Sequence, residues 1–193
     1  SPDLYGYFFT GEQKTEYTIA ATSMLYDGEN RSWDTQTMQK LGIPERVFTE
    51  VDFAGTVRGR IRESVAEELG ISRVPFAVVG SHDTASAVAA IPGEGNFAFC
   101  SSGTWSVFGV ENERPVKTSA VCDAKFSNEG SVQGTFRLSK NIMGLWLVQE
   151  CKRDWQKQGQ FFSYDEIDAA AKASKGLVSI IDTDDASFYA AGN

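Results

Sequence analysis

The only histidine of the chain, His82, lies beside Asp83 in the stretch GSHDTASAV, and this pair is the strongest candidate for chemistry. The preceding run VPFAVV is mostly β-branched and aromatic, which predicts a short buried strand. The small side chains of TASAVAA predict a helix that packs closely on a neighbour. Asp83 therefore lies where a strand ends and a helix begins. An aspartate at this position can cap the helix, or it can face a ligand outside the carboxyl end of the strand. The motif alone leaves both roles open.

Two further candidate sites lie downstream. In SSGTWS, residues 101–106, a glycine flanked by hydroxyls lets the backbone approach a phosphate, and Thr104 can donate a hydrogen bond to it. Asn141 opens the helical pattern of residues 140–157, where it is either an N-cap or a polar contact to a ligand. Gln149 follows about two turns later, where an exposed helix residue is the ordinary interpretation. Each of these signals is weak by itself.

Short helices and strands alternate along the rest of the chain. Glycine caps at Gly11, Gly42 and Gly70 end three of the predicted helices, and Ser32 or Asp34 begins one of them. The stretch AIPGEGN is typical of a turn or linker and separates two α/β pieces. We expect helices over residues 1–11, 32–44, 62–71, 84–90, 140–157 and 163–174, and β structure over residues 55–61, 74–80, 97–103, 104–111 and 125–139.

The composition limits the class of partner. The 193 residues carry 18 basic and 26 acidic side chains, a net charge of -8, which argues against nucleic acid or an anionic membrane surface. An anionic cofactor stays possible, because backbone N–H groups and a bound metal can hold phosphates. The cysteines, three in number, have no paired spacing, and no apolar run is as long as a membrane span. We expect a reduced, cytoplasmic protein.

Three of these blocks occur in one characteristic order. SHDTASAV, SSGTWS and KNIMGLWLVQE resemble the central part of the FGGY carbohydrate-kinase family, and PDLYGYFFTG, EYTIAATSMLYD and GTVRGRI match the same family upstream. The similarity extends over nearly the whole chain and is weakest from about residue 155. The first three blocks point to the branch that phosphorylates L-rhamnulose, since glycerol and xylulose kinases carry other residues around the same aspartate.

The resemblance implies an α/β, actin-like ATPase (ribonuclease H-like) fold with two partial domains. Residues 1–92 would be the C-terminal part of the first kinase domain, and residues 93–193 the N-terminal part of the second. The implied reaction transfers a phosphate from ATP, with Mg2+, to the 1-hydroxyl of L-rhamnulose. By position, the resemblance implies that Asp83 is the general base and also contacts the substrate. It implies that His82, Thr84 and Asn141 contact the sugar. Thr104 and Gln149 match positions that contact ATP.

The chain also departs from the family pattern. The family's opening phosphate-binding hairpin and its downstream glycine-rich adenine segment have no counterpart in these 193 residues. We therefore expect the chain alone to be inactive, and to fold partially or as a homo-oligomer because its predicted strands have unpaired edges. Two alternatives stay open, namely a kinase of another ketose such as L-fuculose, and a non-catalytic sugar-binding, nucleotide-binding or scaffold module.

Overall fold

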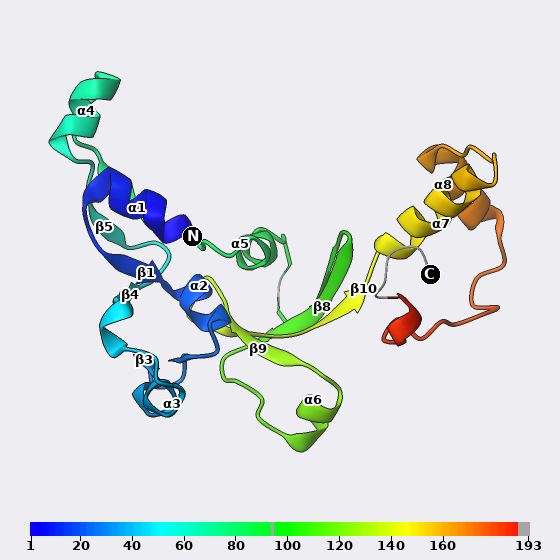
Figure 1. Cartoon of the computed structure of the whole chain (residues 1–193), viewed down its shortest axis with the longest axis horizontal. Helices are drawn as coiled ribbons and strands as arrows, with labels where there is room; N and C mark the ends of the chain where they lie inside the picture. Colours follow the sequence, from blue (N-terminus) through cyan, green and yellow to red (C-terminus); the bar gives the residue numbers. More distant parts are fainter. Residues whose placement is uncertain (94, 189–193) are drawn as a thin grey trace. The chain divides into compact units, whose positions relative to one another are not determined.

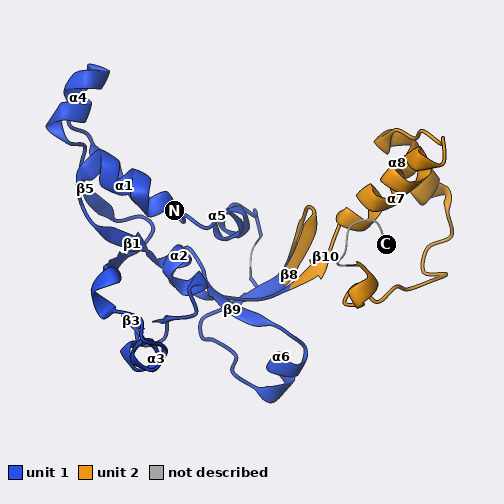
Figure 2. Cartoon of the chain, in the orientation of Figure 1, with its two compact units in different colours: residues 1–99, 109–140 blue, residues 100–108, 141–193 orange. Residues whose placement is uncertain are grey.

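The computed structural model describes residues 1–93 and 95–188 of the chain. The chain divides into two compact units (Figure 2). Unit 1 contains residues 1–99 and 109–140, and unit 2 contains residues 100–108 and 141–193. The division falls within three strands of one sheet, so the predicted domain boundary at residues 92 and 93 stays a prediction.

The first half of the chain is built of short elements (Figure 1). In chain order they are α1 (Pro2–Thr10), β1 (Lys14–Glu16), α2 (Tyr17–Thr22), β2 (Tyr26–Asp27), β3 (Ser32–Trp33), α3 (Thr35–Leu41), η1 (Glu45–Val47), β4 (Glu50–Asp52), β5 (Val57–Arg60), α4 (Glu63–Leu69), β6 (Pro75–Ala77) and α5 (Asp83–Ala89). The second half has longer strands and helices, which are β7 (Ala98–Ser102), β8 (Trp105–Asn112), α6 (Ser119–Asp123), β9 (Ser127–Gly130), β10 (Phe136–Met143), α7 (Trp146–Lys157), α8 (Tyr164–Ala173) and η2 (Ala186–Phe188).

The predicted helix ends are confirmed in unit 1. Helices α1, α3 and α4 end at Gly11, Gly42 and Gly70, whose φ values of 86°, 69° and 64° lie in the left-handed region. A glycine adopts this conformation without the steric penalty that a Cβ brings, so the chain turns away from the helix there. Asp34 caps α3 by accepting a hydrogen bond of 2.9 Å from the backbone N–H of Thr37.

The strands form one larger sheet and three small pairs. The larger sheet has the order β7-β8-β10-β9, and its first two strands are joined by Gly103 and Thr104, so the predicted hairpin is confirmed. Strands β9 and β10 are antiparallel, with Phe136 opposite Gly130. The pairs are β1 with β4, which is parallel, and β2 with β3 and β5 with β6, which are antiparallel.

Two predictions about individual elements are wrong. The run at residues 74–80 is not a buried strand, because β6 is short and pairs with β5 alone in its sheet, which leaves Pro75 and Ala77 exposed. Only Val78 and Gly80, beyond the strand, are buried. The helix predicted from residue 140 begins at Trp146, since sheet pairing keeps the chain extended to the end of β10.

Unit 1 has a core that mixes apolar and polar side chains. Tyr17 and Ala20 of α2 are 1% exposed, and α2 packs against β9, where a Cβ on Gly130 would lie 2.9 Å from the Tyr17 ring. Burial is also the main cause that raises the pKa of Tyr17 to about 12. Arg58 of β5 links β4 and α1 through ion pairs with Asp52 at 2.8 Å and Asp3 at 3.1 Å.

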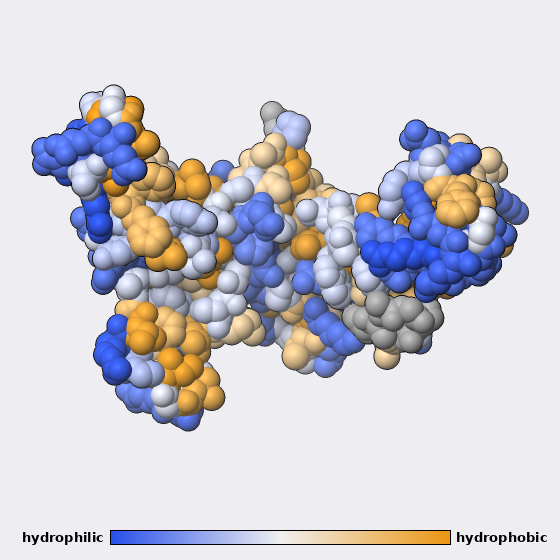
Figure 3. Space-filling model, turned by 45° about the horizontal axis from the view of Figure 1, so that its top comes forward, coloured by the Kyte–Doolittle hydropathy of each residue, from blue (hydrophilic) through white to orange (hydrophobic). Residues whose placement is uncertain are grey.

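Outside this core, many large apolar side chains are exposed, and Figure 3 shows them in orange at several places on the surface. Examples on α1 are Leu4 at 50% and Phe8 at 55% exposure. The three cysteines are free thiols. Within the part of the chain that the structure describes, no helix combines the length and apolar character needed to cross a membrane.

Candidate functional site

Asp83 is the first residue of α5, and its carboxylate is open to solvent. Its side chain is 98% exposed. Its Oδ1 accepts hydrogen bonds from the backbone N–H of Thr84 at 2.6 Å and from the Thr84 hydroxyl at 3.3 Å. His82 occupies the N-cap position, and its side chain makes no capping hydrogen bond. The carboxylate of Asp83 therefore bonds to the first turn of its own helix while its surface remains accessible to a ligand.

Two buried side chains from a distant part of the sequence bind the backbone just before α5. Glu16 and Thr18 are both 0% exposed. The Oε2 atom of Glu16 accepts hydrogen bonds from the Thr18 hydroxyl, from the backbone N–H of Ser81 at 3.0 Å and from that of Ile19 at 3.3 Å. Thr18 Oγ1 in turn accepts a hydrogen bond of 3.0 Å from the backbone N–H of His82. These bonds fix the strand-to-helix junction from which the side chains of residues 82–84 project.

The side chain of His82 lies against a buried arginine. Arg137, on β10, is 1% exposed and places its Nη2 atom 3.3 Å from Nδ1 of His82. The same Nη2 atom donates to the Glu129 carboxylate at 2.9 Å. Burial lowers the pKa of Arg137, while the carboxylates of Glu129, Glu111 and Asp83 oppose this shift. The nitrogens Nε and Nη1 are buried and find no partner among the residues that the structure describes.

Sequence reasoning missed both Glu16 and Arg137. Glu16 begins the block EYTIAATSMLYD, so the match of this block to the kinase family was the available signal. Arg137 lies in the segment TFRLS, where the pattern predicts β structure but does not show which face is buried. A charged residue in such a segment is ordinarily assigned to the solvent face.

In unit 2, the turn that carries Thr104 is held at the start of α7 by backbone hydrogen bonds. The Thr104 carbonyl accepts hydrogen bonds from the backbone N–H groups of Gly144 at 3.1 Å and Trp146 at 3.2 Å. The Gly103 carbonyl accepts a hydrogen bond from the backbone N–H of Leu145 at 2.9 Å. The Thr104 residue itself is exposed. Its hydroxyl is therefore available to donate to a ligand oxygen at the tip of the hairpin.

Gly144 permits this close approach. A Cβ added at Gly144 would lie 2.6 Å from Ser106 Oγ and 2.7 Å from the Gly103 carbonyl oxygen, which is closer than real Cβ contacts. Glycine is thus required for the backbone of residues 103–106 to pack on the segment that leads into α7. The space beside Gly103 is open by comparison, since its nearest neighbour to an added Cβ is at 3.5 Å.

The remaining predicted site residues also belong to unit 2. Asn141 is an exposed residue within β10, so the interpretation as an N-cap of α7 is wrong, and Leu145 holds that position. Gln149 is half-buried in the second turn of α7. The structure therefore groups residues 82–84 at one junction of unit 1, and it places Thr104, Asn141 and Gln149 on neighbouring segments of unit 2.

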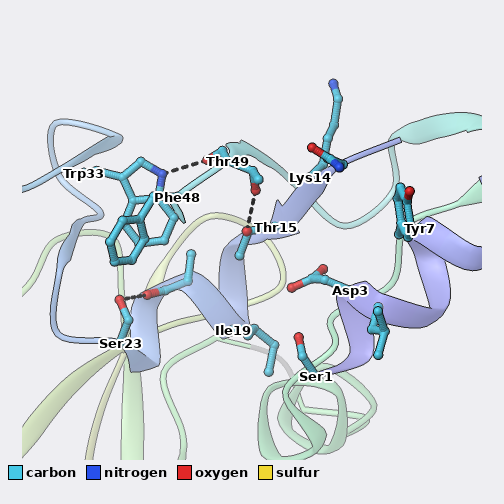
Figure 4. A pocket seen from close by; sticks show the side chains of 13 residues that line it. Ser1, Asp3, Tyr7, Lys14, Thr15, Ile19, Ser23, Trp33, Phe48 and Thr49 are labelled. Carbon is cyan, nitrogen blue, oxygen red and sulfur yellow. Dashed lines mark hydrogen bonds between the residues drawn. The ribbon is translucent and has the colours of Figure 1, made fainter. Parts of the chain in front are cut away.

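A separate pocket of about 360 Å3 lies in unit 1 (Figure 4). Trp33 and Thr49 form part of its wall, where the Trp33 indole N–H donates to the Thr49 carbonyl at 2.7 Å. Thr49 is further linked to Thr15 by a hydrogen bond of 2.7 Å between their hydroxyls. None of the six predicted site residues lines this pocket.

The described residues also offer no ready site for a metal ion. Across residues 1–93 and 95–188, no three His, Cys, Asp or Glu side chains are grouped so that they could hold one. Asp83 is the exposed carboxylate of the junction and could supply a single ligand. A divalent ion needs several oxygen ligands, so these residues do not form a complete metal site.

Two family models match the chain. The model of the N-terminal domain of the FGGY family of carbohydrate kinases matches residues 3–90, and that of the C-terminal domain matches residues 98–193. Among curated proteins, the rhamnulokinase of Bacteroides thetaiotaomicron is 39% identical over 97% of this chain, and that of Oceanobacillus iheyensis is 38% identical over 97%. The chain spans 38% and 39% of the length of these two relatives.

Solved structures show the same fold. A ligand-bound xylulose kinase from Lactobacillus acidophilus superimposes with a TM-score of 0.73 at 16% identity, covering 90% of this chain and 35% of that one. A carbohydrate kinase from Novosphingobium aromaticivorans gives a TM-score of 0.61 at 26% identity, covering 73% and 31%. The predicted α/β, actin-like ATPase fold of sugar kinases is confirmed.

Proposed function

Because the chain belongs to the FGGY family of carbohydrate kinases, we propose that it carries the catalytic base and sugar contacts of an ATP-dependent kinase that acts on L-rhamnulose. The product is L-rhamnulose 1-phosphate. The similarity to rhamnulokinases over nearly the whole chain supports this substrate. The observation that carries the proposal is Asp83, an exposed carboxylate on a junction held rigidly by buried groups.

Asp83 accepts the proton of the sugar 1-hydroxyl as that oxygen attacks the phosphate. Phosphoryl transfer depends mainly on positioning and charge stabilisation, so a fixed base beside the attacking hydroxyl is the expected contribution of this segment. His82, Thr84 and Asn141 contact the sugar hydroxyls in this proposal. The partly exposed imidazole and the polar Thr84 beside it are consistent with that role.

Thr104 and Gln149 contact ATP. The exposed Thr104 hydroxyl, next to the open space at Gly103, suits donation to a phosphate oxygen. ATP supplies the transferred phosphate when it is bound, and Mg2+ would neutralise charge on it. Because these residues do not form a complete metal site, we assign no step to the ion. We place the reaction in the cytoplasm, where ATP is available.

The test uses a kinase of the relatives' full length that contains residues 1–193. The protein is purified, and ADP formation is measured with L-rhamnulose, L-fuculose and D-xylulose at equal concentrations. We expect the largest kcat/KM with L-rhamnulose. A larger kcat/KM with L-fuculose would identify L-fuculose as the substrate instead. If a folded protein that binds ATP forms no ADP with any of the ketoses, the proposal is rejected.

A further inference from the structure

The contact between Arg137 and His82 restricts the chemistry of the histidine. Every N–H of a guanidinium is a donor, and an arginine has no acceptor. The Nη2 atom of Arg137 lies 3.3 Å from Nδ1 of His82, so Nδ1 must be the acceptor of this hydrogen bond. The nitrogen that accepts cannot carry a proton, and in a neutral imidazole the proton is then on Nε2.

We propose that Arg137 is a positioning residue that holds His82 in the neutral tautomer with the proton on Nε2. The Nε2–H group is on the opposite edge of the ring from the buried arginine, and it makes no hydrogen bond with any residue that the structure describes. With 26% of its side chain exposed, His82 can present this group to a ligand oxygen. The imidazole thus becomes a fixed donor for a sugar hydroxyl or ring oxygen.

The charges around His82 are consistent with this assignment. Protonation of Nδ1 would place two donors against each other and bring a second positive charge beside the guanidinium. Asp83 Oδ1 lies 3.9 Å from Nδ1, beyond hydrogen-bonding distance, so it does not compete with Arg137 as the hydrogen-bond partner of this nitrogen. Glu129 directs its carboxylate to Arg137 instead, at 2.9 Å. The group in direct contact with Nδ1 is therefore the Nη2 donor of Arg137.

Burial makes Arg137 a rigid partner. Its side chain is 1% exposed, and the bonds to His82 and Glu129 are made by one nitrogen, Nη2. A buried guanidinium loses water on all sides, so each remaining acceptor matters more than it would at the surface. The ring nitrogen of His82 is one of these acceptors, and losing Arg137 would free the imidazole to rotate and to exchange tautomers.

The first experiment reads the tautomer directly by 15N NMR of the histidine rings in the full-length kinase that contains these residues. The ring signals of His82, the only histidine of residues 1–193, are those that disappear in His82→Gln. At a pH where the ring is neutral, we expect a protonated Nε2 and an unprotonated Nδ1. In Arg137→Met the two nitrogen signals should move toward each other, because both tautomers become populated. Arg137→Lys restores a cationic donor and should largely restore the wild-type signals.

The matched control is Glu129→Gln, which removes the ion pair of Arg137 but leaves its contact to His82. This variant should keep the wild-type ring signals if the tautomer depends on the arginine. A wild-type ring with the proton on Nδ1 overturns the proposal, even if Arg137→Met does not fold. Unchanged signals in a folded Arg137→Met chain, confirmed by circular dichroism, overturn it as well.

The second experiment rests on the proposed function and measures sugar binding in the full-length kinase that contains these residues. Loss of one positioned hydrogen bond should raise KM for L-rhamnulose about threefold to tenfold in Arg137→Met, with KM for ATP unchanged. A purely structural role would instead lower stability and kcat without a selective effect on the sugar. If the kinase acts on no ketose, the proposed function fails, but the NMR result still decides the role of Arg137.

Discussion

The two units hold their site residues in different ways. In unit 1, buried side chains from remote segments fix the junction at residues 81–82, as Glu16 and Thr18 bind its backbone and Arg137 binds its histidine. In unit 2, backbone carbonyls of the hairpin turn bind backbone N–H groups at the start of α7. The junction therefore depends on the chemical identity of its supporting residues.

The turn in unit 2 depends on shape. Any residue can supply a backbone carbonyl, but only glycine leaves room at position 144. Substitutions that remove polar groups should damage unit 1, and substitutions that add volume should damage unit 2. The variants below test this difference, together with the chemical role that we assign to the junction.

The largest effect is expected from Asp83→Asn in the full-length kinase. The change removes the carboxylate that we propose as the base but keeps the shape of the side chain, so turnover with L-rhamnulose should fall about 10²–10⁴-fold. Because the side chain is 98% exposed, the unfolding midpoint in urea should stay the same. Asp165→Asn, at another exposed aspartate in the first turn of a helix, is the control and should retain full turnover. Equal turnover in both variants would return Asp83 to a purely structural role.

Glu16→Ala should have the next largest effect, this time on stability. The Ser81 and Ile19 N–H groups lose this acceptor, which should lower the free energy of unfolding by about 2–4 kcal/mol. Urea denaturation followed by circular dichroism measures the change. Glu67→Ala on the exposed face of α4 removes the same carboxylate without a buried partner and should have little effect. A similar loss in both variants would contradict the described junction.

Gly144→Ala tests the shape of the turn in unit 2. The added methyl group would overlap with Ser106 and Gly103, so we expect a loss of about 1–3 kcal/mol of stability from overpacking. The same variant in the full-length kinase should raise KM for ATP. Gly176→Ala adds a methyl group where nothing lies within 4 Å, and it should leave stability unchanged. A tolerated alanine at 144 would show that the turn can move.

The smallest effects compare two threonines directly. Thr18→Val keeps the volume but removes the acceptor of the His82 N–H, and should cost about 1–2 kcal/mol. Thr104→Val at the exposed tip of the hairpin should stay within about 0.5 kcal/mol of the wild type, and should weaken ATP binding instead. The pair is measured by urea denaturation and by ATP titration of the full-length kinase. Equal stability losses would remove the distinction between the two units.

Much of the local structure was predictable from the sequence. The glycines at 11, 42 and 70 end helices because their left-handed conformation is a local property. The predicted hairpin at residues 97–111 follows from an alternating pattern with a turn in its middle. Features that depend on distant contacts were harder, as the exposed strand β6 and the late start of α7 show.

The exposed residues of the candidate site could be predicted from the sequence, but the buried residues that hold them in place could not. His82 and Asp83 stand out by residue type, and the family motifs add the remaining positions. Glu16 and Arg137 act through contacts across 65 and 55 residues of sequence, and no local pattern shows that a carboxylate or guanidinium is buried. Their roles become visible only when the fold brings the segments together.

The long separation of these supports affects how the site is made. A chain grows from its N-terminus, and contacts between distant segments form only after the later segment has been synthesised. The hydrogen bond between Glu16 and Ser81 therefore forms only after Ser81 has been synthesised, and the contact of His82 forms only after Arg137 has been synthesised. Non-local pairing of this kind also slows folding, because the loop must close before the contact forms. The junction that presents Asp83 therefore cannot be fully ordered before β10, which carries Arg137, has been synthesised.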